Sequence, residues 1–397
     1  MRILWSLPVR GETLASTRGD LVRARSLIAA LRDNGHEVVV VEDGATAAAR
    51  GRVRAYRSVV RRCLPSGPAL MLRDLGRVSH GRGHARRVAA EATSHRADLI
   101  VETQVHFSGS GALAARLTGL PLILDDCSPP TEEATFGCAL PGLARRVFDT
   151  QVAHARAVIV PSDALRERME ADGVPSTNLH VVPNGVDLDV HGTIHRRRHE
   201  RADPARLTLV FAGSFQPWHR PETLVEAVGI LEDERLHLLL LGDGPGRAAA
   251  LDAARRSRLD TRVTAPGALE STALARAIGL GDIGVLPATN DYGHPMKLLD
   301  YAAAGLAIVA PDLPPVREVI EDGETGLLFR PGDAADLAAK IRLVAGDPAL
   351  RTRLGAAARV RIAERGSWHL RANALIDVIT GTVHRRDSNP VREAFPC

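Results

Sequence analysis

A stretch in the second half of the chain carries the residues best suited to hold a phosphate. It covers residues 291–305, DYGHPMKLLDYAAAG, and follows an apolar run at residues 283–287. A helix is predicted to begin near Pro295, where free N–H groups attract anions, with Lys297 in its first turn. Asp300, one turn further, could accept hydrogen bonds from ribose hydroxyls. The spacing predicts a diphosphate clamp; a lone lysine on the surface is the plainer alternative.

Two further stretches have related chemistry. Residues 211–220 read FAGSFQPWHR, in which Gly213 and Ser214 would form a close turn with a hydroxyl group. His219 and Arg220 in the same loop could bring positive charge to a phosphate. Near the N-terminus, Arg18-Gly19 precedes a predicted helix whose N–H groups could face an anion, although a tight turn without a ligand explains that pair equally well.

Short apolar runs alternate with helical patterns along the chain, which is typical of parallel sheets. Two helices are clear, at residues 21–34 with Gly35 as a left-handed cap, and at residues 221–231 with proline in the first turn. Strands are predicted at residues 2–6, 38–41, 99–102, 122–124, 158–160 and 180–182, and then at 207–211, 237–241, 262–264, 283–287, 307–310 and 326–329. The polar, basic stretch 191–203 is interpreted as a linker.

This order predicts an α/β protein of two doubly wound, Rossmann-like domains that face each other. At 397 residues the chain is too long for one ordinary core, although one larger doubly wound domain is an alternative. Ligands of such sheets bind beyond the carboxyl ends of the strands. All three candidate stretches lie at such ends.

The composition is that of a globular protein, with 45% hydrophobic and 25% charged residues and a net charge of +4. No apolar run reaches the ~18 residues of a membrane span, and the first residues predict a strand and no signal peptide. The four cysteines form no CxxC pair, so we expect reduced thiols and a cytoplasmic location. His80 and His84 are four apart, but Gly81 and Gly83 argue against a helical metal pair, and no metal site is predicted.

Positive charge is concentrated at residues 50–87, where many arginines accompany a single acidic residue, Asp74. The solvated face of helices explains this pattern, and an anionic acceptor or peripheral contact with the inner face of an acidic membrane is the alternative. Nucleic acid is disfavoured because Tyr56 is the only aromatic residue there, so stacking platforms are missing.

Several of these stretches together resemble the retaining glycosyltransferases of family 4. The resemblance covers nearly the whole chain, and the subgroup it suggests has GSFxPWHG and SPxKLFEYMAAG motifs. The matching stretches are residues 158–187, the loop at Gly213, residues 241–245, residues 295–310 and residues 318–333.

This resemblance implies the GT-B fold, with a last helix that crosses back to the N-terminal domain. The implied organisation is an acceptor-side domain at 1–187 with the crossing helix at 367–383, a nucleotide-sugar domain at 200–366, and a mobile tail at 384–397. The implied activity is retaining transfer of a sugar from a nucleotide-diphosphate donor to a hydroxyl of a small molecule, glycan or lipid-linked acceptor. The transfer would serve polysaccharide, glycolipid or natural-product assembly, and it would need no metal or other cofactor.

The resemblance also implies roles for single residues. Lys297, assisted by Arg220 and by backbone N–H groups, would stabilise the leaving diphosphate, which can itself take the acceptor proton. Gly19 would approach the diphosphate from the other domain, so that the domains must close. The donor-binding set is Gly19, Gly213, Ser214, His219, Gly267, Ala268, Leu269, Tyr292, His294, Met296, Leu298 and Asp300, with base contacts from the backbone of residues 267–269. The acceptor-side set is Arg18, His106, Asp125, Asp126 and Cys127.

The chain departs from the family at some of these positions. Tyr292 and Asp300 stand where many members have two glutamates, and Ser214 and His219 replace an arginine and a lysine. Arg220 stands where the subgroup has glycine. Cys127 aligns with a histidine of many members.

Three other functions stay open at this point. A phosphorylase or hydrolase would use phosphate or water as the acceptor, and a nucleotide-sugar epimerase would cleave the same bond. A non-catalytic binding protein is suggested by the altered carboxylates.

The residue pattern near the C-terminus also predicts the crossing helix. Residues 364–368 precede a helical pattern at 370–380, whose apolar stripe must be covered. We expect it to dock on the first domain; packing on the second alone is the alternative. The stripe consists of Leu370, Ala374, Leu375, Val378 and Ile379.

Overall fold

The computed structural model describes residues 1–43, 66–130, 138–191 and 206–384. These form two compact units, an N-terminal unit of Met1–Pro183 with Arg371–Cys397, and a C-terminal unit of Asn184–Leu370. The predicted linker at 191–203, except for His191, and the predicted mobile tail beyond His384 lie outside the described residues.

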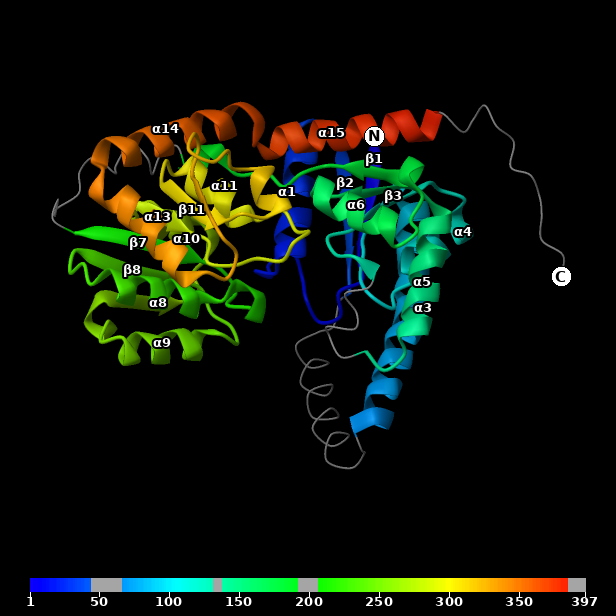
Figure 1. The fold of residues 1–397 in the computed structure, drawn as a ribbon. Helices are drawn as coiled ribbons and strands as arrows, with labels where there is room; N and C mark the ends of the chain where they lie inside the picture. Colours follow the sequence, from blue (N-terminus) through cyan, green and yellow to red (C-terminus); the bar gives the residue numbers. More distant parts are fainter. Residues whose placement is uncertain (44–65, 131–137, 192–205, 385–397) are drawn as a thin grey trace. The chain divides into compact units, whose positions relative to one another are not determined.

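The N-terminal unit is a parallel sheet covered by helices (Figure 1). Its described strands have the order β2-β1-β3-β4-β5-β6. The strands are β1 (Arg2–Leu7), β2 (Glu37–Glu42), β3 (Leu99–Thr103), β4 (Leu122–Asp125), β5 (Ala155–Val160) and β6 (Leu179–Val181). The helices are α1 (Gly19–Asp33), α3 (Ser66–Ser94), α4 (Ser110–Thr118), α5 (Pro141–His154) and α6 (Asp163–Ala171). The predicted left-handed cap of α1 is present, since Gly35 has φ +84°.

The C-terminal unit is a second parallel sheet, with strand order β12-β11-β10-β7-β8-β9 among the described residues. Its strands are β7 (Leu207–Ala212), β8 (Leu236–Leu241), β9 (Val263–Gly267), β10 (Ile283–Val285), β11 (Ala307–Pro311) and β12 (Leu327–Phe329). Its helices include α8 (Pro221–Leu231), α9 (Arg247–Arg256), α10 (Ser271–Ile278), α11 (Met296–Ala303), α13 (Ala334–Gly346) and α14 (Pro348–Arg365).

Alternation along the strands divides the core of this unit into two layers. Leu209 and Phe211 of β7 point to a cluster with α8, α9 and α13, whereas Val210 and Ala212 point to a cluster with α10, α11 and α14. Because both faces are covered, the strands are apolar on both sides, which is why they were recognisable as continuous apolar runs. All predicted strands are confirmed, with ends shifted by up to three residues.

The last helix, α15 (Trp368–His384), passes from one unit to the other. From Arg371 onward its residues belong to the N-terminal unit, where Leu375 and Ile379 are buried. The Asn34 side chain at the end of α1 donates to Asn373 Oδ1 at 2.7 Å. The prediction for Leu370 is wrong, because this residue in the first turn is 43% exposed.

Candidate functional site

The strand order of the C-terminal unit brings the loops of interest to one edge of its sheet. The neighbours β10, β7, β8 and β9 are parallel, so the loops that follow them start side by side. The predicted donor-binding residues of the unit lie at the end of β9, in these loops and in α11, which follows the loop after β10.

Two of the loops pack backbone against backbone. Gly242 and Gly244, which follow β8, have φ +115° and +152°. A Cβ atom on Gly242 would overlap the carbonyl oxygen of Gly213, and one on Gly244 would overlap that of Ser214. The buried ring of Phe215, edge-on to Phe211 with centroids 5.2 Å apart, anchors the loop from below. The loop after β7 is therefore rigid where it turns.

Lys297 and His219 meet above this turn. Lys297 Nζ lies 3.1 Å from His219 Nε2, and a Cβ atom on Gly213 would lie 3.2 Å from Lys297 Cε. His219 Nδ1 accepts the backbone N–H of Gln216 at 3.3 Å. A neutral ring whose Nδ1 accepts must carry its hydrogen on Nε2. The ammonium and the ring N–H therefore converge without an acceptor between them, and an anion would satisfy both.

The electrostatics of the pair agree with this geometry. Desolvation lowers the pKa of Lys297 to about 8, although Asp300 opposes the shift. Burial, with Lys297 as a second cause, lowers the pKa of His219 far below its ordinary value. The imidazole is therefore neutral near pH 7, and the charge of the pair resides on the lysine.

Helix α11 presents Lys297 from its first turn. The hydroxyl of Tyr301 accepts the backbone N–H of Ala212 at 2.8 Å, which fixes the helix to the end of β7. The N–H groups of Met296, Lys297 and Leu298 were expected to face the diphosphate. The Leu298 N–H donates to the Pro295 carbonyl at 3.0 Å, so those of Met296 and Lys297 are left for a ligand. No pattern in the sequence had indicated this role of Tyr301.

The other predicted donor residues differ in their surroundings. Ser214 and Ala268 are exposed, whereas Tyr292 and His294 are buried. Leu269 packs on the core. The carbonyl of Gly267 accepts a hydrogen bond from Gly242 N at 2.9 Å. Asp300 contacts a residue that the sequence had placed in the linker, since His191 Nε2 lies 3.2 Å from Asp300 Oδ1.

Among the described residues, no hydrogen bond or ion pair joins Arg220 to the surroundings of Lys297. Its side chain is 52% exposed and its Nε lies 3.6 Å from Glu222 Oε1. Its φ of +41° is left-handed, which explains why glycine suits this position in the resembling subgroup. The assisting role of Arg220 stays a prediction.

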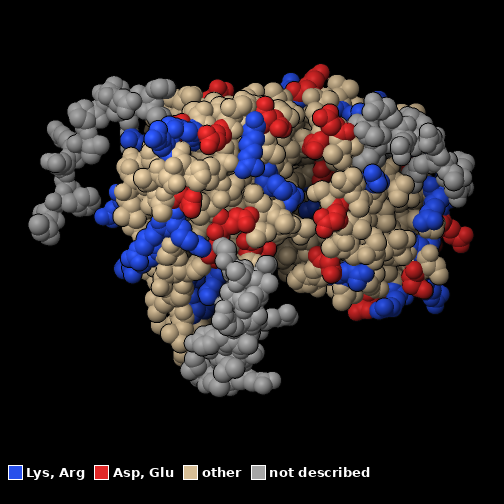
Figure 2. Space-filling model, turned by 180° about the vertical axis from the view of Figure 1, so that it is seen from behind, with Lys and Arg blue, Asp and Glu red and all other residues tan. Residues whose placement is uncertain are grey.

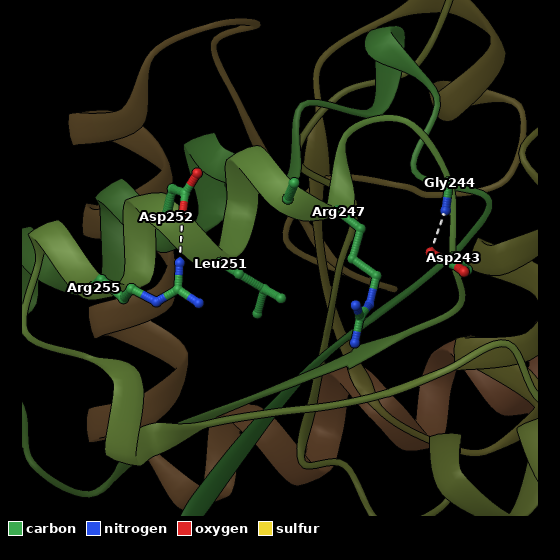
Figure 3. Close-up of a pocket in the computed structure, with 7 residues that line it drawn as sticks. Asp243, Gly244, Arg247, Leu251, Asp252 and Arg255 are labelled. Atoms are coloured by element: carbon green, nitrogen blue, oxygen red, sulfur yellow. Dashed lines mark hydrogen bonds and ion pairs between the residues drawn. The ribbon is translucent and has the colours of Figure 1, made fainter.

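A surface hollow of about 300 Å³ lies elsewhere, along α9 (Figure 3). Arg247, Leu251 and Asp252 line it, together with Asp243, Gly244, Ala248 and Arg255. Arg247 donates to the Ala265 carbonyl at 2.8 Å, and Asp252 pairs with Arg255. None of the predicted donor residues lines this hollow, so it is distinct from the clamp.

The acceptor-side candidates lie at the carboxyl edge of the N-terminal sheet. Asp125 is fully buried, and its Oδ1 accepts from Arg23 Nε at 2.8 Å, so this carboxylate is engaged inside the unit. The Cys127 thiol is desolvated, which raises its pKa, and it is half-buried. Arg18 pairs with Asp20 at 2.6 Å beside Gly19, the first residue of α1.

Asp126 is the unusual member of this group. It is 1% exposed, and its Oδ1 accepts from Ser128 N at 3.2 Å. Its Oδ2 has no hydrogen-bond partner among the residues that the structure describes. Burial raises its pKa to about 7, opposed by the Ser128 N–H and by the charge of His106. A carboxyl that titrates near neutrality at a strand end is a candidate for binding or proton transfer.

A stability measurement would test this carboxyl. The unfolded chain has the ordinary pKa of 3.8, so between about pH 4 and 7 the folded protein binds more protons and its stability falls as pH rises. We expect Asp126→Asn to raise the free energy of unfolding at pH 8 by up to about 4 kcal/mol relative to wild type, and to change it little at pH 4. Urea unfolding at both pH values measures the difference. The matched control is Asp149→Asn, whose side chain is 52% exposed; equal effects of Asp126→Asn at both pH values would contradict the shifted carboxyl.

Part of the basic region 50–87 is described, as α3. Arg73 and Arg77 pair with the buried Asp74, and Arg87 pairs with Asp43. Figure 2 shows Lys and Arg interspersed with Asp and Glu over the face in view. No helix in the described segments is long and apolar enough to cross a membrane. Peripheral contact with a membrane stays a prediction.

His80 and His84 lie within α3, so the glycines beside them do not break the helix. His80 pairs with Asp43, and His84 Nε2 lies 3.1 Å from Ser6 Oγ. Over the ranges with described side chains, no group of three His, Cys, Asp or Glu residues could hold a metal ion. Metal independence stays a prediction.

The chain matches two known protein families and several known proteins. Residues 206–347 match the family described as Glycosyl transferases group 1, and residues 21–190 match Glycosyltransferase Family 4. A D-inositol 3-phosphate glycosyltransferase of Streptomyces avermitilis is 30% identical over 379 residues, which cover 88% of this chain and 80% of that protein. One from Pseudarthrobacter chlorophenolicus is 29% identical over 244 residues, covering 58% of this chain and 57% of the relative.

Two solved structures have a fold similar to that of this chain. Anabaena HepE in complex with UDP-glucose has a TM-score of 0.72 at 17% identity, covering 96% of this chain and all of that one. Sucrose-phosphate synthase from Thermosynechococcus elongatus has a TM-score of 0.71 at 17% identity, covering 97% and 100%. The chain belongs to the GT-B glycosyltransferases of the family 4 and group 1 type. Sugar transfer is thus its class of activity.

Proposed function

We propose that this chain is a retaining glycosyltransferase whose donor is a nucleoside diphosphate sugar. The observation that carries the proposal is the convergence of Lys297 Nζ and His219 Nε2, 3.1 Å apart, at the start of α11. A diphosphate is an anion that can accept from both groups and from the first N–H groups of the helix. Retention of the anomeric configuration is inferred from the family resemblance.

The residues have separable tasks in this mechanism. As the bond between the anomeric carbon and the diphosphate oxygen breaks, negative charge grows on the leaving group, and Lys297 stabilises it. The His219 N–H orients the same phosphate, and the leaving oxygen takes the proton of the acceptor hydroxyl that attacks from the same face. Asp300 accepts from the ribose, and the backbone near Gly267 contacts the base.

Names of similar proteins guide the choice of ligands. HepE was solved with UDP and with UDP-glucose, and several relatives are named D-inositol 3-phosphate glycosyltransferase. Uridine diphosphate sugars are therefore the first donors to test, and phosphorylated polyols are the first acceptors. Glycans and lipid-linked sugars are the next acceptors to test. The proposed products serve polysaccharide, glycolipid or natural-product assembly.

A thermal-shift panel of nucleoside diphosphate sugars tests the donor. A ligand at 100 times its dissociation constant stabilises the folded state by about 2.7 kcal/mol. The donor that stabilises most is then incubated with acceptors, and the anomeric configuration of the product is read by NMR. An inverted product would refute retention, and turnover only with water or phosphate would favour a hydrolase or phosphorylase.

Transfer is expected to proceed without a divalent metal. The ammonium of Lys297 and the start of α11 already oppose the charge of the diphosphate, as a metal ion would. Initial rates with the best donor should agree within about twofold in EDTA and in magnesium. Loss of activity in EDTA that magnesium or manganese restores would contradict this prediction.

A further inference from the structure

Residues 184–191 form a short segment that is tied to α11 and the loop before it. At its start, Asn184 Nδ2 donates to the His294 carbonyl at 2.9 Å. In its middle, Val186 is buried in the same cluster as the apolar face of α11, and its N–H donates to the Gly366 carbonyl at 2.8 Å. The segment therefore has a fixed position beside the proposed donor site.

The last turn of this segment aims His191 at Asp300. Asp187 Oδ1 accepts the N–H groups of Asp189 and Val190, each at 3.1 Å, which closes the turn. The His191 side chain is 5% exposed, and its Nε2 lies 3.2 Å from Asp300 Oδ1. An ionised carboxylate only accepts, so Nε2 carries the hydrogen of this bond.

This contact engages Oδ1 of Asp300, and within the described part of the chain no hydrogen bond engages the other carboxylate oxygen. The Asp300 side chain is 33% exposed, so it still reaches solvent. A half-exposed aspartate would otherwise exchange among rotamers, and a bond from a buried, well-anchored ring selects one of them. Aspartate is also one methylene shorter than glutamate, so its orientation decides whether it reaches a ligand.

We propose that His191 is a positioning residue that holds the Asp300 carboxylate for the ribose hydroxyls of the donor. The inference rests on the proposed function, because it assumes a ribonucleotide at this edge of the sheet. His191 itself does not touch the donor. It sets how strongly the site distinguishes a ribonucleotide from a deoxyribonucleotide.

The test compares UDP with 2′-deoxy-UDP and 3′-deoxy-UDP by calorimetry on the full chain. We expect wild type to bind UDP about tenfold more tightly than the deoxy compound that lacks the contacted hydroxyl. His191→Phe keeps a ring of similar volume without the donor, and should lose most of this preference while its affinity for the deoxy compound stays within about twofold. His191→Gln, whose amide N–H can replace Nε2–H, should restore much of the preference.

Asp300→Asn provides a second test. Adding His191→Phe to this variant should cause no further loss of the preference for UDP, because both residues act through one contact. Equal losses for UDP and both deoxy compounds in His191→Phe would overturn the proposal and leave a structural role only. Retained preference in that variant would overturn it as well. If wild type binds no nucleoside diphosphate from the thermal-shift panel, the proposed function fails instead, which is a distinct result.

Discussion

Lys297→Ala is expected to lower turnover about 10²–10³-fold at saturating donor, while the fold survives. The ammonium lies 3.1 Å from His219 and meets no acceptor from that ring, so its charge is available to a leaving diphosphate. Removing it leaves the growing negative charge to the helix N–H groups and His219. Because this charge develops in the transition state, the loss should appear in kcat more than in KM.

The chain supplies an unusually clean control for this experiment. Of its 51 basic residues only Lys297 and Lys340 are lysines, and Lys340 lies in α13. Lys340→Ala should keep wild-type kinetics, and both variants should keep wild-type melting temperatures. A Lys297→Ala enzyme with wild-type turnover would remove this residue from the mechanism.

Leu375→Ala is expected to destabilise the N-terminal unit by about 2–5 kcal/mol. Leu375 is 0% exposed in the middle of α15, between the buried residues Ala372 and Ile379 on the same face of the helix. Removing its branched end leaves a cavity in a helix that reaches this unit from the other end of the chain. Truncation of the chain after Gly366 would remove the whole apolar face of α15 and should lower both stability and turnover.

Urea unfolding followed by tryptophan fluorescence would measure this effect, because Trp5 is a fully buried residue of β1 in the same unit. The matched control is Asp377→Ala, an exposed position of α15 whose substitution should change stability by less than about 0.5 kcal/mol. If Leu375→Ala behaves like Asp377→Ala, then α15 contributes little to the unit to which it belongs.

Much of the fold could be predicted because its signals are local and repeated. Buried parallel strands are apolar on both faces, so residues 209–212 of β7 and 238–241 of β8 were visible as unbroken apolar runs. Leu370 shows the limit of pattern reasoning. It fits the apolar stripe of α15, but it lies in the first turn before the helix reaches its core, so it stays exposed.

The candidate site was only partly predictable, because contacts between distant residues leave no local pattern. Lys297 and His219 were each proposed as phosphate-binding, but their contact spans 78 positions. His191 was assigned to a linker because the stretch after it is polar and basic, whereas its side chain contacts Asp300, 109 positions away. Asp125 was expected to face the acceptor from a strand end, but in the structure its carboxylate forms an ion pair with Arg23.

The scarcity of lysine has a practical consequence. Amine-directed reagents meet two lysine side chains in this protein, Lys297 and Lys340. Because desolvation lowers the pKa of Lys297 to about 8, a sizeable share of its side chain is a nucleophilic free amine in mildly alkaline buffer. Acylation of Lys297, counted by mass spectrometry of a single peptide, would report how full the site is. Ligands could then be ranked by the protection they give, before any acceptor is known.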